Sequence, residues 1–400
     1  MGADLARELA IPAETKLVLL VLDGLGGLPR EAGGPTELEA AATPTLDRLA
    51  AEGVTGLLTL VAPGITPGSG PGHLALFGYD PLTHRIGRGI LEALGIDLPV
   101  TPLDVAARGN FCTVDGAGRV TDRRAGRVSD ATCRTLSALL DKITVDGAEV
   151  TVQPVKEHRF VVRFRGEGLS EAVSETDPQQ EGQAPPKAEP LQPEAAKSAR
   201  VVNAFVDAAR GVLRDQHPAN MVLLRGFARH PALPTLRERF GLRAGAIAVY
   251  PMYRGLARLA GMEVLPTGTT ITEQLATLRD RWAEFDFFYI HVKRTDTAGE
   301  DGDFAAKARA IEEVDRALPA LVALGPDVLA VTGDHSTPAA LRAHSWHPVP
   351  VLLWARTCRP DTVTTFGERP CEAGGLGHLP GRELLTVMLA HAGRLTKFGA

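Results

Sequence analysis

Five short apolar runs, each stopping abruptly at a polar residue, constrain the fold of this chain more than any other feature. The runs are KLVLLVLD, NMVLLRG, FDFFYIHVK, DVLAVTGDH and PVPVLLW. Because their apolar residues are continuous rather than alternating, each run is typical of a strand buried on both faces of a mostly parallel sheet. Helix-like segments lie between them, namely TPTLDRLAAEG, GDFAAKARAIEEVDRALPALVAL and ELLTVMLAHAG. This alternation predicts an α/β fold, a mostly parallel sheet flanked by helices.

A change of pattern indicates a second domain. At 400 residues the chain has room for two or three domains. Residues 95–180 contain shorter, alternating stretches rich in arginine, so we expect a smaller α+β domain there. We expect it to be inserted as a lid into a catalytic domain made of residues 1–94 and 181–400. The first part of the second segment, residues 181–200, is rich in glutamate, proline and alanine, which predicts a linker or mobile loop.

Composition favours a small-molecule ligand. The net charge of −5 gives no electrostatic reason to expect a nucleic-acid partner. The N-terminus, MGADLARELA, carries acidic residues where a signal peptide is apolar, and LVLLVL is far too short to span a membrane. We therefore expect a cytoplasmic protein with no membrane partner. The four cysteines form no CxxC pair and are expected to be reduced thiols: Cys112, Cys133, Cys358 and Cys371.

Carboxylates and imidazoles lie at the ends of the predicted strands. In open parallel sheets, ligands bind beyond the carboxyl ends of the strands. Carboxylate and imidazole groups are also the ligand types suited to manganese, zinc and similar divalent ions. Taken singly, each residue has a structural explanation as a turn, a helix cap or a solvated surface group, but their joint placement favours a metal site. The residues are Asp23, Asp296, Glu300, Asp334, His335 and His344.

Ser69 lies within a tight run of glycine and proline, TPGSGPGHLALFGYDP, just before an expected helix. A serine in this position is either a helix cap or a nucleophile. The free N–H groups of a helix N-terminus favour a phosphate, and a nearby cation would activate the hydroxyl. Because a capping serine needs no metal cluster, the strand-end residues favour the nucleophile.

Several motifs together resemble those of one protein family. GSGPGH, TGDHST, KRTDTAGEDG and HSWHPVP resemble motifs of the alkaline phosphatase superfamily. The more specific resemblance is to the cofactor-independent phosphoglycerate mutases of the archaeal type, which also occur in bacteria. It runs nearly end to end, through LVLDGLGGLP, DRRAGR, MYRGLARLAGMEV and the final KFGA.

The resemblance implies an alkaline-phosphatase-like fold and a site for two divalent ions. Asp23, Ser69, Asp334 and His335 would hold one ion, and Asp296, Glu300 and His344 would hold the other. Related mutases often have histidine at the position of Glu300, so a harder carboxylate ligand here favours manganese or magnesium over zinc. We take manganese as the preferred ion, with magnesium, cobalt and zinc as the other candidates.

The implied activity is the interconversion of 3-phosphoglycerate and 2-phosphoglycerate through a phosphoserine at Ser69. Water must be excluded while the phosphoserine exists, which would give the inserted domain its purpose. A metal-dependent phosphomonoesterase of the same superfamily is the nearest alternative, because the same serine and metals would serve a site open to water. A non-catalytic metal or phosphometabolite sensor is a third interpretation, weakened by the complete set of ligand types.

Arginine suits a substrate that carries both phosphate and carboxylate, because its planar guanidinium group binds either one through two hydrogen bonds. Each of the candidate arginines also has a bland explanation as a surface residue of an arginine-rich chain. The substrate-binding candidates are Arg123, Arg124, Arg127, His158, Arg159, Arg225 and Lys293.

Overall fold

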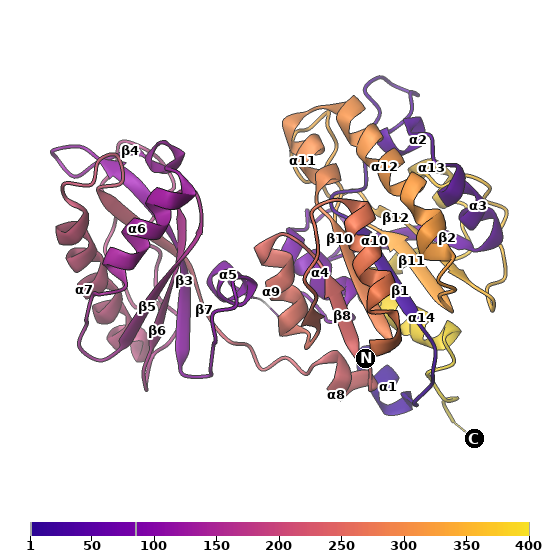
Figure 1. Cartoon of the computed structure of the whole chain (residues 1–400), viewed down its shortest axis with the longest axis horizontal. Coiled ribbons are helices and arrows are strands. Elements are labelled where there is room, and N and C mark those ends of the chain that lie inside the picture. The colour runs from indigo at the N-terminus through magenta and orange to yellow at the C-terminus, as the bar shows by residue number, and fades with distance from the viewer. Residues whose placement is uncertain (1, 85, 400) are drawn as a thin grey trace. The chain divides into compact units, whose positions relative to one another are not determined.

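The structure, a computed structural model, describes residues 2–84 and 86–399. Its contacts divide the chain into two compact units. Unit 1 runs to residue 85 and resumes at Leu233, and unit 2 is Ile86–Ala232. Each unit contains its own sheet (Figure 1).

Unit 1 is built on an eight-stranded sheet. Five of its seven strand pairs are parallel, and the two exceptions both involve one strand, β12. In spatial order the strands are β13 (Gly377–Pro380), β2 (Val54–Thr59), β12 (Val349–Ala355), β11 (Val328–Thr332), β1 (Leu17–Leu22), β10 (Phe287–Val292), β8 (Ala244–Ile247) and β9 (Glu263–Val264).

The helices of unit 1 connect these strands and flank the sheet, with α10 and α12 lying side by side (Figure 1). They are α1 (Gly2–Leu9), α2 (Glu37–Ala40), α3 (Pro44–Glu52), α4 (Ser69–Leu76), α8 (Leu236–Phe240), α9 (Pro251–Leu259), α10 (Ile271–Asp280), α11 (Arg294–Asp301), α12 (Phe304–Val322), α13 (Glu368–Cys371) and α14 (Leu384–His391), with short 3-10 turns at Trp282–Glu284 and Gly381–Glu383.

The continuous apolar runs behave as expected in the middle of this sheet. β1 pairs in parallel with β10 on one side and with β11 on the other, and all six of its residues are buried. A strand covered on both faces has no solvent side for a polar residue, which explains the lack of alternation in LVLLVL. The predicted α/β class, with a mostly parallel sheet flanked by helices, is confirmed.

Unit 2 is an α+β unit with a five-stranded antiparallel sheet. Helices α6 and α7 pack on one face of the sheet over the apolar core, and α5 packs against β3 and β7 (Figure 1). The elements are α5 (Arg88–Gly95), β3 (Asp104–Val114), β4 (Val120–Asp122), a 3-10 turn (Ala125–Arg127), α6 (Asp130–Leu140), β5 (Glu149–Lys156), β6 (Arg159–Arg165), a 3-10 turn (Pro193–Ala195), α7 (Ala196–Leu213) and β7 (Met221–Arg229).

The expected boundaries of the inserted domain, 95–180, are wrong on both sides, because unit 2 begins at Ile86, so that it includes α5, and ends at Ala232. The run NMVLLRG, assigned from sequence to the catalytic sheet, is β7, and it pairs antiparallel with β3 inside unit 2. The stretch 181–200 is not a free linker either. Gly182 and Gln183 exchange backbone hydrogen bonds with Val120, and Asn203 bonds both backbone groups of Ala188. Backbone pairing therefore ties this proline-rich segment to unit 2, which extends to residue 232.

No helix in the described part of the chain is long and apolar enough to cross a membrane.

Candidate active site and metal centre

The candidate site lies in unit 1, where β1, β10 and β11 end. These three strands are neighbours in the sheet, so the residues that follow them meet at one edge. Asp23 follows β1 directly, Asp296 lies in the first turn of α11 after β10, and Asp334 and His335 follow β11. All four side chains are fully buried, although three are carboxylates.

A first group of ligand atoms surrounds Nε2 of His335. Oδ1 of Asp23 lies 3.2 Å from this nitrogen, and Oδ2 of Asp334 lies 3.3 Å from it. Ser69 Oγ is also 3.3 Å from the same nitrogen. The two carboxylate oxygens have no hydrogen-bond partner among the described residues. Buried carboxylate oxygens without a donor need a compensating charge, so the chemistry of this group fits a divalent cation.

The other ring nitrogen of His335 is held by a hydroxyl. Nδ1 lies 2.9 Å from Oγ1 of Thr337, and this hydroxyl donates to Oδ1 of Asp296 at 2.5 Å. Because the hydroxyl proton is used toward the carboxylate, Thr337 accepts from Nδ1–H. The arrangement leaves Nε2 as the nitrogen that could bind a metal, since an outer hydrogen bond at one ring nitrogen commonly orients the other toward an ion.

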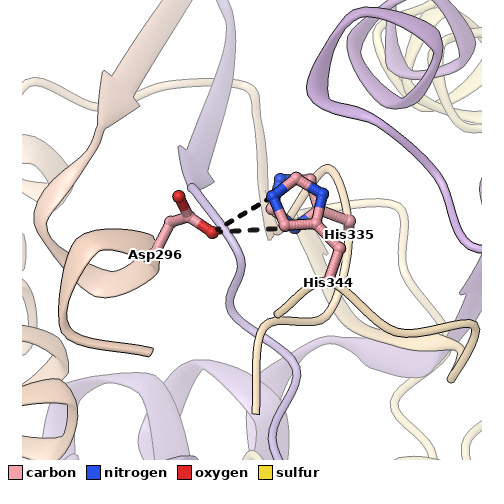
Figure 2. Close-up of side chains that lie close together, drawn as sticks. All are labelled: Asp296, His335 and His344. Atoms are coloured by element: carbon pink, nitrogen blue, oxygen red, sulfur yellow. Dashed lines mark ion pairs between the residues drawn. The ribbon is translucent and has the colours of Figure 1, made fainter. Parts of the chain in front are cut away.

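A second group comprises Asp296, His344 and Glu300. His344 Nε2 lies 3.6 Å from Oδ1 of Asp296 and 3.9 Å from Oε1 of Glu300. Its Nδ1 donates to the carbonyl of Pro67 at 3.1 Å, so Nε2 again faces the acids. Figure 2 shows the rings of His335 and His344 beside Asp296; they are stacked with centroids 3.6 Å apart. The second group, Asp296, Glu300 and His344, thus offers two carboxylates and one imidazole.

Ser69 is the first residue of α4, and Gly68 is the N-cap residue, with no side-chain cap. The interpretation of Ser69 as a helix cap is therefore wrong. Gly72 explains part of the glycine pattern, because a Cβ at that position would lie 2.0 Å from the carbonyl oxygen of Asp334. His73, one turn after Ser69, donates from Nδ1 to the Ser69 carbonyl and lies 3.1 Å from Asp334 Oδ2. The helix is thus locked against the loop that carries Asp334.

Lys293 lies between the two groups. Its Nζ contacts Oδ2 of Asp23 at 3.0 Å and Oδ2 of Asp296 at 2.5 Å. These oxygens are the ones that do not face His335, so the lysine orients both carboxylates. Burial lowers the pKa of Lys293, but the two carboxylates outweigh burial and raise it above its usual value.

Asp23 keeps its negative charge despite complete burial. Burial raises the pKa of Asp23, yet contacts with His291 and His335 and the charge of Lys293 outweigh it and hold that pKa well below its usual range. Burial similarly lowers the pKa of His335, but Asp334 and Asp23 reverse the effect and raise it to about 9. Without metal, His335 is therefore protonated at neutral pH and supplies positive charge where the acids converge.

Three of the substrate-binding candidates in unit 2, His158, Arg159 and Arg225, lie in the surroundings of the buried acid Glu92. Glu92 of α5 lies 3.3 Å from Nε of Arg108, and both are nearly fully buried. Burial raises the pKa of Glu92 above its usual value, and the charges of Arg108, Arg159, Arg88 and Arg225 offset only part of that rise. His158 belongs to the same surroundings, because its pKa is lowered to about 4 by burial and then by Arg159 and Arg108. The arginines outnumber the acid, which leaves an excess of positive charge around Glu92 that is suited to an anion.

The remaining candidates, in DRRAGR, lie elsewhere in unit 2. Arg123 forms a bidentate pair with Asp177, with hydrogen bonds of 3.1 and 2.7 Å, which favours the structural interpretation of that residue. Arg124 and Arg127 are exposed on the 3-10 turn, where Ala125, Gly126 and Arg127 have φ values of 46°, 63° and 52°. Left-handed backbone is costly for residues with a Cβ, and such strain is common at functional loops.

Sequence reasoning missed several residues of the site. Tyr253 of α9 donates a short hydrogen bond to Asp23 Oδ2 and stacks on His291 with centroids 3.6 Å apart. Tyr253 lies within the motif MYRGLARLAGMEV, but nothing in that motif indicates a contact with Asp23, which is 230 residues away. Thr337 and His73 carried a weak signal, since each lies within a quoted motif, two residues after His335 and four after Ser69.

Comparison with known proteins places the chain among close relatives. A family model described as 2,3-bisphosphoglycerate-independent phosphoglycerate mutase matches residues 50–220. A probable 2,3-bisphosphoglycerate-independent phosphoglycerate mutase of Thermotoga neapolitana is 52% identical over 98% of both chains. One of the same description from Thermus thermophilus is also 52% identical over 98% of both chains.

Solved structures agree with these relatives. A protein from Pyrococcus horikoshii has a TM-score of 0.84 and 30% identity, over 97% of this chain and 100% of that one. The cofactor-independent phosphoglycerate mutase from Thermoplasma acidophilum has a TM-score of 0.72 and 29% identity, over 94% of this chain and 100% of that one. The fold and the family expected from the motifs are thereby confirmed. This chain belongs to the family of 2,3-bisphosphoglycerate-independent phosphoglycerate mutases.

Proposed function

We propose that this chain interconverts 3-phosphoglycerate and 2-phosphoglycerate through a phosphoserine at Ser69, on a site that holds two divalent ions. The observation that carries the proposal is the position of the Ser69 hydroxyl. Its oxygen lies 3.3 Å from His335 Nε2, which is itself within 3.3 Å of buried oxygens of Asp23 and Asp334. A nucleophile at a helix N-terminus beside metal ligands is suited to receive a phosphoryl group.

Asp23, Ser69, Asp334 and His335 would hold the first ion, and Asp296, Glu300 and His344 the second. The grouping is supported by the two histidines, each of which donates Nδ1–H to another acceptor and keeps Nε2 for a metal. When bound, the two ions would favour the alkoxide of Ser69 and neutralise charge on the transferred phosphoryl oxygens.

The residues of the chain then carry out the transfer. Ser69 Oγ loses its proton and attacks phosphorus, a bond from serine oxygen to phosphorus forms, and the bond from phosphorus to the glycerate oxygen breaks. The released glycerate oxygen takes up a proton. The other hydroxyl of the same glycerate then loses its proton and attacks the phosphoserine, so that its bond to phosphorus forms, the bond from phosphorus to Ser69 Oγ breaks, and the serine oxygen takes up a proton again. The backbone N–H groups at the start of α4 face the phosphoryl group and stabilise its charge.

Unit 2 would bind the glycerate and keep water away from the phosphoserine. Support comes from the arginines around Glu92, whose excess charge matches a substrate with a phosphate and a carboxylate. The strained turn that presents Arg124 and Arg127 supports a functional role for those two residues as well. Lys293, with a side chain 32% exposed beside Asp23, is the remaining candidate contact.

Manganese is our proposed ion for the second group. Glu300 gives that group two hard carboxylate ligands and one imidazole, a set that suits manganese or magnesium better than zinc. Metal analysis of protein purified without added metal tests this choice, and stoichiometric zinc would contradict it. The cytoplasmic location and the absence of nucleic-acid and membrane partners remain predictions from composition.

The proposed function is tested by two measurements on the same protein. Conversion of 3-phosphoglycerate, followed by coupling 2-phosphoglycerate to enolase, should greatly exceed the release of inorganic phosphate. Replacement S69A should lower conversion by at least about 10⁴-fold, as loss of a nucleophile typically does, while the metal content stays unchanged. Release of inorganic phosphate as the main reaction would instead support the phosphomonoesterase alternative.

A further inference from the structure

A buried lysine lies outside the ligand groups described above. The side chain of Lys307, on α12, is fully buried. Its Nζ donates to the carbonyl of Gly26 at 2.9 Å and to the carbonyl of Thr337 at 2.8 Å. The first carbonyl belongs to the loop after β1 and the second to the loop after β11, so one cation joins the loops that carry Asp23 and His335.

A buried acid holds the same two loops. Glu37 of α2 is fully buried. Its Oε2 accepts from the backbone N–H of Leu28 at 3.1 Å, in the loop after β1. Its Oε1 accepts from the backbone N–H of Ala339 at 2.6 Å, in the loop after β11. Lysine thus satisfies carbonyls and glutamate satisfies amides of one pair of loops.

These loops contain the hydroxyl that connects the two ligand groups. Thr337 Oγ1 lies between Nδ1 of His335 and Oδ1 of Asp296, at 2.9 and 2.5 Å. The space around the hydroxyl is tight, since a Cβ added at Gly24 would lie only 2.4 Å from Thr337 Oγ1. A shift of the Thr337 backbone would therefore misplace one ligand of each ion.

We propose that Lys307 and Glu37 are positioning residues for the metal centre, acting through the backbone of the two loops and the hydroxyl of Thr337. Burying a lysine and a glutamate is costly, and an apolar side chain of similar length would pack at either position without that cost. Their retention is explained by the loop groups that they hold. The inference rests on the two-ion site proposed above.

The test compares K307M with a matched control, K16M, in the full-length protein. Lys16 Nζ likewise donates to two backbone carbonyls, those of Trp282 at 2.8 Å and Phe285 at 2.5 Å, but at the opposite edge of the sheet, where β10 begins. Metal-free protein is titrated with Co²⁺, and both the dissociation constants and the visible absorption of bound Co²⁺ are recorded. Circular dichroism confirms that each variant is folded at the temperature of the titration.

K307M should weaken Co²⁺ binding by about tenfold and change the absorption spectrum, because outer hydrogen-bond partners typically contribute tenfold or more to metal affinity. K16M should leave both unchanged. Normal Co²⁺ binding and a normal spectrum in K307M would overturn the positioning role alone, whereas wild-type protein that binds no Co²⁺ would refute the metal site itself. If K307M does not fold, E37Q decides, since it keeps the size of the side chain; unchanged Co²⁺ binding in E37Q would equally overturn the inference.

Discussion

Metal binding should release a proton from His335. In the metal-free protein its pKa is raised to about 9, because burial, which lowers it, is outweighed by Asp334 and Asp23. The carboxylates have lowered pKa values and carry no proton at pH 7. A cation bound at Nε2 must therefore displace the proton of His335 at pH 7 and need displace none above about pH 9.

The size of the effect follows from the shift. Removing a proton from a group with a pKa of about 9 at pH 7 costs about 2.7 kcal/mol, at 1.36 kcal/mol per pH unit. The first ion should thus bind about a hundredfold more weakly at pH 7 than above pH 9. The folding stability of the metal-free protein changes in the opposite direction, because it falls as the pH rises. A raised pKa stabilises the fold fully below pH 6.5, the usual value, and this contribution is lost as the pH rises to about 9.

Calorimetric titration with Mn²⁺ in buffers of different ionisation enthalpy counts the protons released. We expect about one more proton per chain at pH 7 than at pH 10. The control is H335Q, which lacks the titrating imidazole. The unfolding free energy of metal-free H335Q should therefore not fall between pH 6.5 and 9, as that of the wild-type protein does. Equal proton counts at both pH values in the wild-type protein would refute the reasoning.

Three other predictions follow from the geometry of the site. G24A should destabilise the protein by about 1–3 kcal/mol in chemical denaturation and weaken metal binding, because φ is +64° and the new Cβ would meet Thr337 and Asp296. The control G33A, where φ is +77° and no atom lies within 4 Å of the new Cβ, should retain normal metal binding. Equal losses of metal binding in the two variants would contradict the prediction. Brief treatment with a chelator should remove about half of the bound metal quickly and the rest slowly, because the two sites differ in exposure. The side chains of Glu300 and His344 are 55% and 24% exposed, while those of Asp23 and Asp334 are 0% exposed. Release of all the metal in a single phase would argue against two unequal sites. Y253F should lower the unfolding free energy of metal-free protein by about 1.5–3 kcal/mol, which is the usual contribution of a hydrogen bond to a charged group. A change below about 0.5 kcal/mol would show that the hydrogen bond from Tyr253 to Asp23 does not stabilise the fold.

The fold was predictable where burial left a clear pattern. β1 is covered on both faces and reads as a continuous apolar run. The same pattern misassigned β7, because α5 and α7 both pack against that strand although it belongs to the antiparallel sheet of unit 2. A continuous run reports coverage of both faces and says nothing about which sheet the strand joins. The pairing of Val120 with residues 182 and 183 was likewise invisible, because it satisfies backbone groups and needs no particular side chains.

The residues of the candidate site also fall into those that sequence could predict and those that it could not. Asp23, Asp334 and His335 were accessible from sequence because strand ends bring carboxylates to one edge of a sheet. Tyr253 and Arg108 were not, since each reaches its partner only through tertiary packing, Tyr253 from α9 to Asp23 and Arg108 from β3 to Glu92. Lys307 was hidden for a further reason. It lies in a helix whose other buried residues are mostly apolar, and nothing in the sequence distinguishes a buried lysine there from a solvated one.

The central claim is that the Ser69 oxygen carries the phosphoryl group during turnover. Protein mixed with 3-phosphoglycerate and Mn²⁺, quenched in acid within milliseconds and digested, can be analysed by mass spectrometry for the phosphorylated residue. The account predicts phosphate on the peptide that contains Ser69, and none on that peptide in S69A. Phosphate on another residue, or wild-type turnover with no phosphorylated peptide at any quench time, would contradict it.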